Sequence, residues 1–387
     1  MFNVLLVGAG EINFGSTEGP WNHTARLEAL LGSNLRIVGL IDPDTERAQK
    51  AINDKVRQSI EAQTAWKDTL AFKDVREAKE QLGSSVIALV VIGCPPHFRG
   101  TLEKGKNTDV EVLQFFSHAQ AILVEKPVAA VDPHSHSLAL ISKEYEKFEG
   151  VCSIGYMLRY LKAVKKIKDT LHAKNLTPTL INGRYFMAYE YARKLSWWNS
   201  SVSCGPVVEQ ATHFVDLIRY FADSPVLFDT VQAHIVEHDE QAGHLSKKGF
   251  DEELIDVNDR VPRITMASWK HATGTIGSIC HGISLHGTRY DTQLEVLADG
   301  WLFRLSGAYT DTPRLDIIKP GTAEIETFSE VDDPFLTEIS TVVDASQHLA
   351  GHKPLSTFDD ALQTYELTWA IRRAGERSSA KRRESKT

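Results

Sequence analysis

The chain has 387 residues, of which 42% are hydrophobic and 24% charged, and its formal net charge at pH 7 is −8. This composition is that of an ordinary globular protein long enough for about two domains, and the negative charge argues against binding nucleic acid through a broad basic surface. No stretch is apolar for long enough to span a bilayer, the first residues predict a strand and not a signal segment, and the four cysteines form no CxxC pair. We therefore expect a cytoplasmic protein that has no nucleic-acid or membrane partner.

The first half of the chain alternates apolar runs with helical patterns, which is typical of a doubly wound parallel sheet. We expect strands at Phe2–Val7, Arg36–Ile41, Val86–Ile92 and Ala121–Val124, and helices at Arg26–Leu31 and Thr45–Gln63.

After about residue 150 the pattern changes to longer alternating segments without helices between them. Such segments indicate an open antiparallel sheet with one covered face. A short strand at Val151–Tyr156 and a helix at Ala163–His172 come before these segments, and helices at Pro334–Leu349 and Phe358–Arg373 follow them. The alternating strands are expected at Arg263–Trp269, Gly274–Ile283, Gln293–Leu297 and Leu315–Ile318.

The sequence thus predicts an α/β protein with two domains. A doubly wound parallel sheet occupies residues 1–150, and an α+β domain with an open, mostly antiparallel sheet occupies residues 151–375. Residues 376–387 form a basic, flexible tail.

A glycine turn follows the first expected strand. It contains Gly8 and Gly10, and Asn13 stands where a dinucleotide-binding fingerprint has its third glycine. The first glycine permits the tight turn, the second lets a pyrophosphate approach the backbone, and the third allows the helix to pack closely on the strand. The long segment Phe14–Asn22 indicates an enlarged loop and a helix that starts near Thr24. An ordinary glycine turn is the alternative for this motif alone.

Asp42 ends the second expected strand, where a carboxylate can accept hydrogen bonds from the adenosine ribose hydroxyls. An acid at this point repels a 2'-phosphate, so we expect NAD to be preferred over NADP, although Arg47 is close enough in sequence to soften the preference. The expected cofactor contacts are Gly8, Gly10, Glu11, Ile12, Asn13, Asp42, Pro95, Glu125 and Lys126.

The segment Ala121–Pro127 (AILVEKP) leads from a buried strand directly into a turn that carries a lysine. Ligands of open parallel sheets collect beyond the carboxyl ends of the strands, so Lys126 is expected at the mouth of a binding crevice. The alternative is a surface lysine that happens to precede a proline.

A second group of polar residues lies in the helical pattern around Gly205–Phe221. Glu209, His213 and Asp216 are four and three residues apart, so a helix would place all three on one face. A histidine between two carboxylates suits proton transfer, because its pKa is near neutrality and its neighbours set its tautomer. A polar stripe facing water is the alternative, but the surrounding apolar residues indicate that these groups are partly buried and partnered.

Other candidate residues are less specific. Tyr156 and Arg159, in the segment GYMLRY, could line the pocket of a polar ligand or pack in the core. Trp198, in the pair Trp197–Trp198, could cover a sugar ring or dock its loop. His281 and His286 are an odd number of residues apart on an expected strand, so their side chains would point to opposite faces. His134 and His136 have no cysteine or acid cluster nearby. We therefore predict no metal.

Four segments together resemble one known family: GAGEIN, AILVEKP, GYMLRY and GPVVEQATHFVDLIRYF. They are similar to the NAD(P)-dependent oxidoreductases that include glucose-fructose oxidoreductase, inositol dehydrogenase and MocA, and the resemblance covers nearly the whole chain. It implies an N-terminal Rossmann domain followed by an α+β domain whose open sheet often forms oligomer contacts. A homo-oligomer joined through the C-terminal sheet is therefore expected.

The resemblance also implies an activity and the residues that perform it. The reaction would be reversible hydride transfer between nicotinamide and a secondary alcohol of a sugar, cyclitol or related polyol. His213 would be the general base and Lys126 would stabilise the developing alkoxide. Glu209 stands where relatives commonly have aspartate, and Asp216 would orient the imidazole or hold the helix in place. The expected substrate contacts are Lys126, Tyr156, Arg159, Trp198 and His213.

Two alternatives belong to other functional classes. Fungal galactose-pathway repressors use the same fold to bind a dinucleotide and a partner protein without turnover, but such a sensor has no physical need for Lys126 together with His213. A reductase of unsaturated or tetrapyrrole-like substrates would need an open, mostly apolar substrate face, whereas Tyr156, Arg159 and the Trp197–Trp198 loop indicate a polar ligand.

Overall fold

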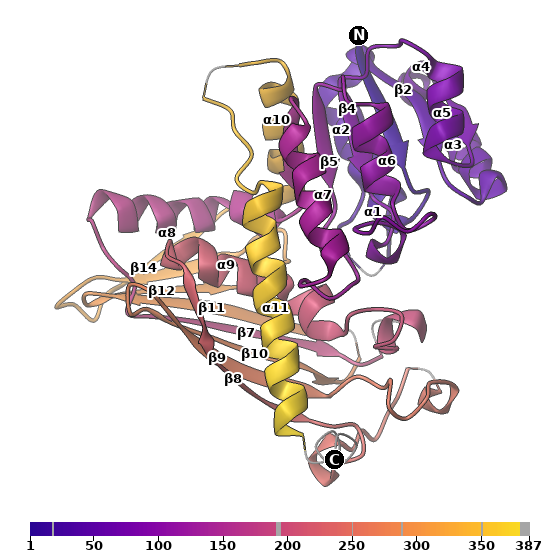
Figure 1. Ribbon diagram of the computed structural model, residues 1–387. Coiled ribbons are helices and arrows are strands. Elements are labelled where there is room, and N and C mark those ends of the chain that lie inside the picture. Colours follow the sequence, from indigo (N-terminus) through magenta and orange to yellow (C-terminus); the bar gives the residue numbers. More distant parts are fainter. Residues whose placement is uncertain (18, 191–194, 250, 288, 350, 380–387) are drawn as a thin grey trace. The chain divides into compact units, whose positions relative to one another are not determined.

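The structure of the chain is a computed structural model that describes residues 1–379 apart from 18, 191–194, 250, 288 and 350. The chain divides into two compact units (Figure 1). Unit 1 consists of Met1–Met157 and Pro334–Leu362, and unit 2 consists of Leu158–Asp333 and Gln363–Thr387.

The predicted doubly wound parallel sheet is confirmed in unit 1. Its six strands pair in the order β3-β2-β1-β4-β5-β6, and every pair is parallel. The strand order reverses between β1 and β4, and ligands of such sheets bind beyond the carboxyl ends of the strands at this point. The strands are β1 Phe2–Val7, β2 Leu35–Ile41, β3 Leu70–Phe72, β4 Leu89–Ile92, β5 Ala121–Val124 and β6 Val151–Ile154.

Both helices predicted for the first half of the chain are present, one of them with a break, whereas the helices Val75–Leu82, Thr108–Phe115 and His136–Lys147 were not predicted. The predicted helix Thr45–Gln63 is divided in two, because Ser59 has an extended backbone and its side chain caps the next helix by accepting a hydrogen bond from Ala62 N. The helices are α1 Glu11–Phe14, α2 His23–Leu31, α3 Thr45–Gln58, α4 Ile60–Trp66, α5 Val75–Leu82, α6 Thr108–Phe115, α7 His136–Lys147 and α10 Pro334–Ser346.

The helix α10 belongs to unit 1, although the sequence analysis placed it in the second domain. Its side chains Ile339, Val342 and Val343 are buried in the same core as Leu27 of α2 and Leu123 of β5. The helix therefore covers apolar surface of the parallel sheet, and this burial, which sequence order does not reveal, decides the unit to which it belongs.

Unit 2 contains the expected open sheet. Eight strands pair in the order β14-β13-β12-β11-β7-β10-β9-β8, and every pair is antiparallel except the parallel pair of β7 and β10. The strands are β7 Leu180–Ala188, β8 Val226–Val236, β9 Ile264–His271, β10 Ile276–Leu285, β11 Tyr290–Ala298, β12 Trp301–Ser306, β13 Arg314–Ile318 and β14 Ile325–Ser329.

One face of this sheet is covered and the other is open. In β9 the side chains of Thr265, Ala267 and Trp269 are buried, whereas those of Met266 and Lys270 are exposed. The helix α9 Thr212–Ala222 packs on β7 and β10, and α8 Lys162–Ala173 contacts β12 (Figure 1). The predicted single covered face is thus confirmed.

The last helix, α11 Phe358–Ser378, is longer than predicted and includes the first residues of the expected basic tail, while residues 380–387 lie outside the described residues. None of the helices in the described part of the chain has both the length and the hydropathy that a membrane span needs. Short helical turns complete the fold: η1 Gly32–Asn34, η2 Pro96–Phe98, η3 Met157–Tyr160, η4 Leu195–Trp198, the π-helix η5 Val207–Ala211, η6 Gln241–Gly243 and η7 Glu252–Leu254.

Candidate active site

The glycine turn after β1 has the geometry that a dinucleotide pyrophosphate requires. Gly8 has φ +94°, and a Cβ there would lie 3.0 Å from the backbone nitrogen of Cys94, so only glycine fits. Gly10 precedes α1, and a Cβ there would meet no atom of the described residues within 4 Å. The turn therefore has room for a ligand beside Gly10, and these residues fit the NAD cofactor that the fingerprint predicts.

Asn13 braces this turn from inside. It is fully buried, and its Nδ2 donates to the Gly8 carbonyl at 2.7 Å and to the Val7 carbonyl at 3.2 Å. The close packing that a third glycine would permit is provided by Gly93, where a Cβ would lie 2.7 Å from the Asn13 side chain. Asn13, predicted as a cofactor contact, thus supports the turn by hydrogen bonds from its side chain to the backbone carbonyls of the turn. The enlarged loop is also present, and α2 begins at His23, one residue before the predicted start.

Asp42 holds the turn and the start of α3 together. Its Oδ2 accepts from Ala9 N at 2.8 Å, and its Oδ1 accepts from Asp44 N at 2.9 Å and from Arg47 Nη2 at 2.6 Å. The Arg47 guanidinium therefore lies directly against the carboxylate that was predicted to bind the ribose.

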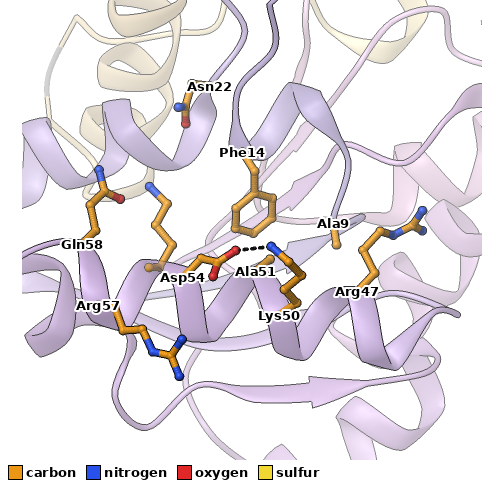
Figure 2. A pocket seen from close by; sticks show the side chains of 10 residues that line it. Ala9, Phe14, Asn22, Arg47, Lys50, Ala51, Asp54, Arg57 and Gln58 are labelled. Atoms are coloured by element: carbon orange, nitrogen blue, oxygen red, sulfur yellow. Dashed lines mark hydrogen bonds and ion pairs between the residues drawn. The ribbon is translucent and has the colours of Figure 1, made fainter.

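An open cavity of about 570 Å³ extends from this point along α3 (Figure 2). Phe14 and Asn22 line one side of it, and α3 lines the other. Among its ten lining residues are the cations Arg47, Lys50, Lys55 and Arg57, and the one carboxylate is Asp54, which pairs with Lys50 at 2.6 Å. Arg47 and Lys55 are also paired with carboxylates, with Asp42 at 2.6 Å and with Glu28 at 3.0 Å, so most of the positive charge beside the predicted adenosine site is compensated.

Glu125, which precedes Lys126 at the end of β5, is a fixed and buried anion. His23 Nε2 lies 2.8 Å from its Oε1, and a Cβ on Gly155 would come within 3.1 Å of its carboxylate. Burial alone would raise the pKa of Glu125, but the hydrogen bond and charge of His23 and the charges of Lys126 and Arg99 bring this pKa below its usual value. Glu125, expected as a cofactor contact, therefore shapes the turn that carries Lys126.

Arg99 ties the turn after β4 to the turn after β5. Its side chain is 1% exposed, its Nε donates to the Cys94 carbonyl at 3.2 Å, and its Nη1 donates to the Pro127 carbonyl. The neighbouring Gly100 N donates to the buried Asp109 carboxylate at 2.9 Å. Arg99 thereby fixes the two turns at which Pro95 and Lys126 stand, and Pro95 itself is exposed.

In unit 2, His213 lies in the first turn of α9, directly after a π-helical turn. His213 is 7% exposed, and the π-helix Val207–Ala211 contains Glu209 and Gln210, which are also buried. A π-helix has more residues per turn than an α-helix, and such turns occur frequently at functional sites. The α-helical spacing that placed Glu209 and His213 on one face therefore does not describe this segment.

Gln210 is held by two strands of the sheet. Its Oε1 lies 2.9 Å from His281 Nε2 of β10, and its Nε2 donates to the Met187 sulfur of β7. Burial lowers the pKa of His281 to about 3, so the imidazole is neutral and its Nε2–H donates to Gln210. This hydrogen bond attaches the π-turn to the sheet.

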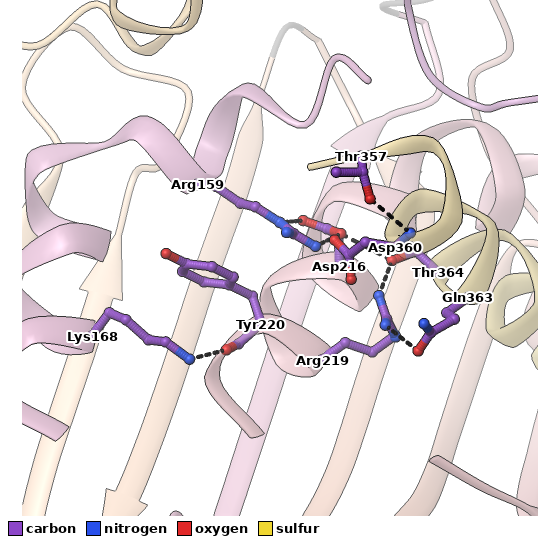
Figure 3. A network of polar contacts seen from close by, with 9 residues as sticks. All are labelled: Arg159, Lys168, Asp216, Arg219, Tyr220, Thr357, Asp360, Gln363 and Thr364. Carbon is purple, nitrogen blue, oxygen red and sulfur yellow. Dashed lines mark hydrogen bonds and ion pairs between the residues drawn. The ribbon is translucent and has the colours of Figure 1, made fainter. Parts of the chain in front are cut away.

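Asp216 pairs with Arg159 and not with His213 (Figure 3). Arg159 Nε and Nη2 donate to its two oxygens at 2.7 and 2.6 Å, and the two side chains are 3% and 1% exposed. Thr364 Oγ1 donates to Asp216 at 2.9 Å. Of the two roles foreseen for Asp216, this geometry favours holding the helix, and it gives Arg159 a structural role beside the predicted substrate contact.

The aromatic candidates are buried. Trp198 is 2% exposed, and its ring centroid lies 4.5 Å from that of Tyr189 in a small core that also contains Ile283. Its side chain docks the loop, which was the alternative to covering a sugar ring, and the Trp197 side chain lies outside the described residues. Tyr156 is likewise buried.

Three contributors to these sites were missed by sequence reasoning. Arg99 follows the Cys94–Pro96 turn as an ordinary charged residue, and no pattern marks it as buried. Gln210 lies in the helical pattern around Gly205–Phe221, but it has no titratable group and so did not stand out as a candidate. His281 was considered only as a metal ligand, although a histidine on an apolar strand already indicates a buried partner.

Comparison with known proteins places this arrangement in a family. Residues 2–155 match the Gfo/Idh/MocA oxidoreductase family with its NAD-binding Rossmann fold, and residues 159–301 match an oxidoreductase C terminal domain. Two uncharacterised proteins of Schizosaccharomyces pombe (strain 972) are 40% and 38% identical to the chain; each comparison covers 96% of it, and 96% and 91% of the respective relatives.

Solved structures share the fold at low identity. A dehydrogenase from Chromobacterium violaceum has a TM-score of 0.71 at 16% identity, with 100% of this chain and 98% of that chain covered. The UDP-N-acetylglucosamine 3-dehydrogenase from Acidithiobacillus ferrooxidans has a TM-score of 0.67 at 14% identity, covering 97% and 98%. The WlbA dehydrogenase of Chromobacterium violaceum, solved with NADH and UDP-GlcNAcA, has a TM-score of 0.66 at 16% identity, covering 97% and 94%. The chain belongs to the Gfo/Idh/MocA family of oxidoreductases and is a dehydrogenase or reductase with an NAD-binding Rossmann domain.

Proposed function

We propose that this oxidoreductase transfers a hydride between nicotinamide and a secondary alcohol or ketone of a sugar, cyclitol or related polyol. The observation that carries the proposal is a lysine, Lys126, on a turn that the buried Glu125 and Arg99 hold at the carboxyl end of β5, an interior strand of the parallel sheet. Two structural neighbours bear names that include a UDP-linked sugar, which supports a sugar-related substrate.

In this proposal the protein supplies the proton transfer and the charge. A bound nicotinamide would accept or return the hydride. His213 takes the hydroxyl proton as general base, and Glu209 supplies a carboxylate four residues before it in the chain. Lys126 stabilises the developing alkoxide, because a fixed cation in a water-poor site acts most strongly where charge appears in the transition state.

Substitution of Lys126→Met tests this scheme. Loss of one group that stabilises a developing anion is expected to lower kcat by roughly 10² to 10³. The dissociation constant of NADH, measured by its fluorescence, should stay within about twofold of the wild-type value. Lys104→Met, at an exposed lysine of unit 1, is the matched control.

The substrate panel for this test consists of aldoses, inositols and dihydrodiols, and turnover is read by absorbance of the reduced cofactor. Unchanged turnover in Lys126→Met would remove this lysine from the mechanism. NAD binding by the wild type without turnover of any compound would favour the dinucleotide-binding sensor instead.

We also propose that the protein is a cytoplasmic homo-oligomer joined through the open face of the sheet in unit 2. A row of aliphatic side chains crosses this face, because each member is directly paired with the next across neighbouring strands. Three of them are 39–54% exposed, and contiguous apolar patches of this kind mark interaction sites. The row consists of Ile276, Leu180, Leu297, Leu302, Ile318 and Ile325.

A further inference from the structure

Three tyrosines of unit 2 gather beside His213. The Tyr309 ring meets the His213 imidazole edge to face, with ring centroids 6.2 Å apart. The Tyr309 centroid lies 5.7 Å from that of Tyr185 and 6.2 Å from that of Tyr290, and Tyr185 and Tyr290 are stacked at 5.8 Å. This cluster includes no residue of the glycine turn or of the turn that carries Lys126, and it takes no part in the contacts of Asp216.

The cluster lies on the covered face of the sheet, at the place where α9 begins. Tyr185 is paired with His281 on one side and with Thr292 on the other, so the three side chains point to the same face. Tyr290 precedes Thr292 by two residues and therefore also points to that face. Tyr185 stacks on Phe214, the residue after His213, at 5.7 Å, which places the aromatic rings against the first turn of the helix.

Tyr309 is presented by a turn that is fixed before any ligand binds. Gly307 has φ +66°, its N–H donates to the Thr292 carbonyl at 3.0 Å, and Thr310 N donates back to the Gly307 carbonyl at 2.9 Å. Ala308 N donates to Thr292 Oγ1 at 3.2 Å. The turn is thus anchored on β11, so that little conformational entropy is lost when the Tyr309 ring contacts a ligand.

The exposure and the chemistry of these rings suit a ligand with a flat apolar side and hydroxyl groups. Tyr185 is buried, Tyr309 is half-buried and Tyr290 is 37% exposed. The cluster therefore extends from the core to a part of the sheet that solvent can reach. Burial, with the neighbouring Tyr290, raises the pKa of Tyr309 well above its usual value, so its hydroxyl stays protonated and can donate a hydrogen bond. Aromatic rings bind apolar faces through buried area, and the phenol hydroxyls add polar contacts.

We propose that Tyr309 and Tyr290 form the wall against which a saturated monosaccharide or cyclitol ring binds beside His213. The C–H face of such a ring would lie on the tyrosine rings, whereas an open-chain polyol of the same carbon number presents no flat face. The inference deepens the proposed function and rests on it for the position of the reacting hydroxyl, but ring recognition by itself can be measured without turnover.

The test uses the full chain saturated with NADH and follows binding by isothermal titration calorimetry. D-Glucose is compared with D-glucitol, and D-galactose with galactitol, because the members of each pair differ in ring closure at equal carbon number; myo-inositol is the cyclitol probe. The wild type is expected to bind at least one cyclic compound at least about tenfold more tightly than the open-chain compounds.

Tyr309→Ala should raise the dissociation constant of the cyclic ligand by about tenfold and leave that of the open-chain compounds unchanged. Tyr309→Phe keeps the ring and should retain the preference for cyclic ligands. Phe228→Ala, which removes an aromatic side chain that is 43% exposed on β8, is the control and should bind as the wild type does. Thermal unfolding of each variant shows that it is folded.

Three results would overturn the proposal. The first is a wild type that binds no cyclic compound more tightly than the open-chain compounds. The second is wild-type binding by Tyr309→Ala. The third is a loss of preference in Tyr309→Phe as large as in Tyr309→Ala. Ring-selective binding without turnover of any compound would instead count against the proposed dehydrogenase reaction and leave the ring wall in place.

Discussion

Asp42, directly after β2, and Arg47, in the first turn of α3, form an ion pair in the predicted adenosine site. Asp42 accepts from the glycine turn as well as from Arg47, so its charge is partly neutralised by a guanidinium that also lines the cavity along α3. An isolated acid here would exclude a 2'-phosphate. Because Arg47 pairs with Asp42, the carboxylate repels the 2'-phosphate of NADP less strongly, as the proximity of Arg47 in the sequence suggested.

We predict that NAD binds more tightly than NADP and that Arg47→Ala increases the difference. Removal of one charge-assisted contact should weaken NADP binding by about tenfold and change NAD binding little. Dissociation constants from fluorescence of NADH and NADPH measure both effects. Arg57→Ala is the matched control, because Arg57 lines the same cavity but lies about 15 Å farther along the helix axis. Tighter binding of NADP by the wild type would contradict the prediction.

His281 makes the stability of the protein sensitive to acid. Its pKa falls from 6.5 to about 3 because burial disfavours the imidazolium. Between these pH values the unfolded chain binds the proton and the folded chain does not, so the free energy of unfolding decreases as the pH falls below about 6.5.

Replacing His281 with Gln removes this titration and still permits a hydrogen bond to Gln210. The dependence of the unfolding free energy on pH should become shallower by up to about 1.4 kcal/mol per pH unit between pH 6 and pH 4. Urea unfolding at several pH values measures the slope. His286→Gln, at an exposed histidine just after the same strand, should leave it unchanged. Equal slopes for His281→Gln and the wild type would show that this histidine is not the acid-sensitive group.

At the scale of elements, α9 is held by the ion pair of Arg159 and Asp216, and no pattern in the sequence connects these two residues. Arg159 and Asp216 are 57 positions apart and bind each other through two hydrogen bonds in a buried setting (Figure 3). Removal of one partner leaves the other charge buried without compensation, which costs far more than the pair itself contributes.

Arg159→Met should therefore lower the free energy of unfolding by about 3–5 kcal/mol, as measured by urea denaturation. The double variant Arg159→Met/Asp216→Leu should recover most of this loss, because it removes both charges. Lys165→Met is the control: Lys165 pairs with Asp169, the two side chains are 73% and 63% exposed, and such surface pairs contribute about 0–1 kcal/mol. A double variant as unstable as Arg159→Met would refute the account.

Element prediction succeeded where the pattern is local. The strands β1 and β5 agree with their predicted bounds at both ends, because short runs of Val, Ile and Leu between turn residues have few other solutions. The strands β7 and β8 were missed, and their polar members, such as Arg184 and Asp229, are tolerated because they lie on the open face or an edge. The π-turn before His213 was missed as well, since its hydrogen bonds to the sheet decide its geometry.

At the scale of the whole molecule, the aliphatic row on the open sheet face predicts self-association. A charge in the centre of the row should prevent burial of this face, because an unpaired lysine in an apolar interface is strongly unfavourable. We expect Leu297→Lys to elute as a smaller species than the wild type in size-exclusion chromatography with light scattering. Leu254→Lys, at a leucine that is 70% exposed outside the sheet, should elute as the wild type does. A wild type that is monomeric at micromolar concentration would contradict the proposed oligomer.

The sequence by itself determined the fold class, the family motifs and the residues around which the site is sought. These features depend on local patterns. Two apolar strands lead into the turns that contain Gly8 and Lys126, and a helical segment carries His213. Only the tertiary structure decided which residues support them. Arg99, Gln210 and Tyr309 acquire their roles from burial and from partners distant in the chain, and Asn13 acquires its role from burial inside the glycine turn. Burial and long-range hydrogen bonds depend on which elements pack together, and for this reason a local pattern does not contain them.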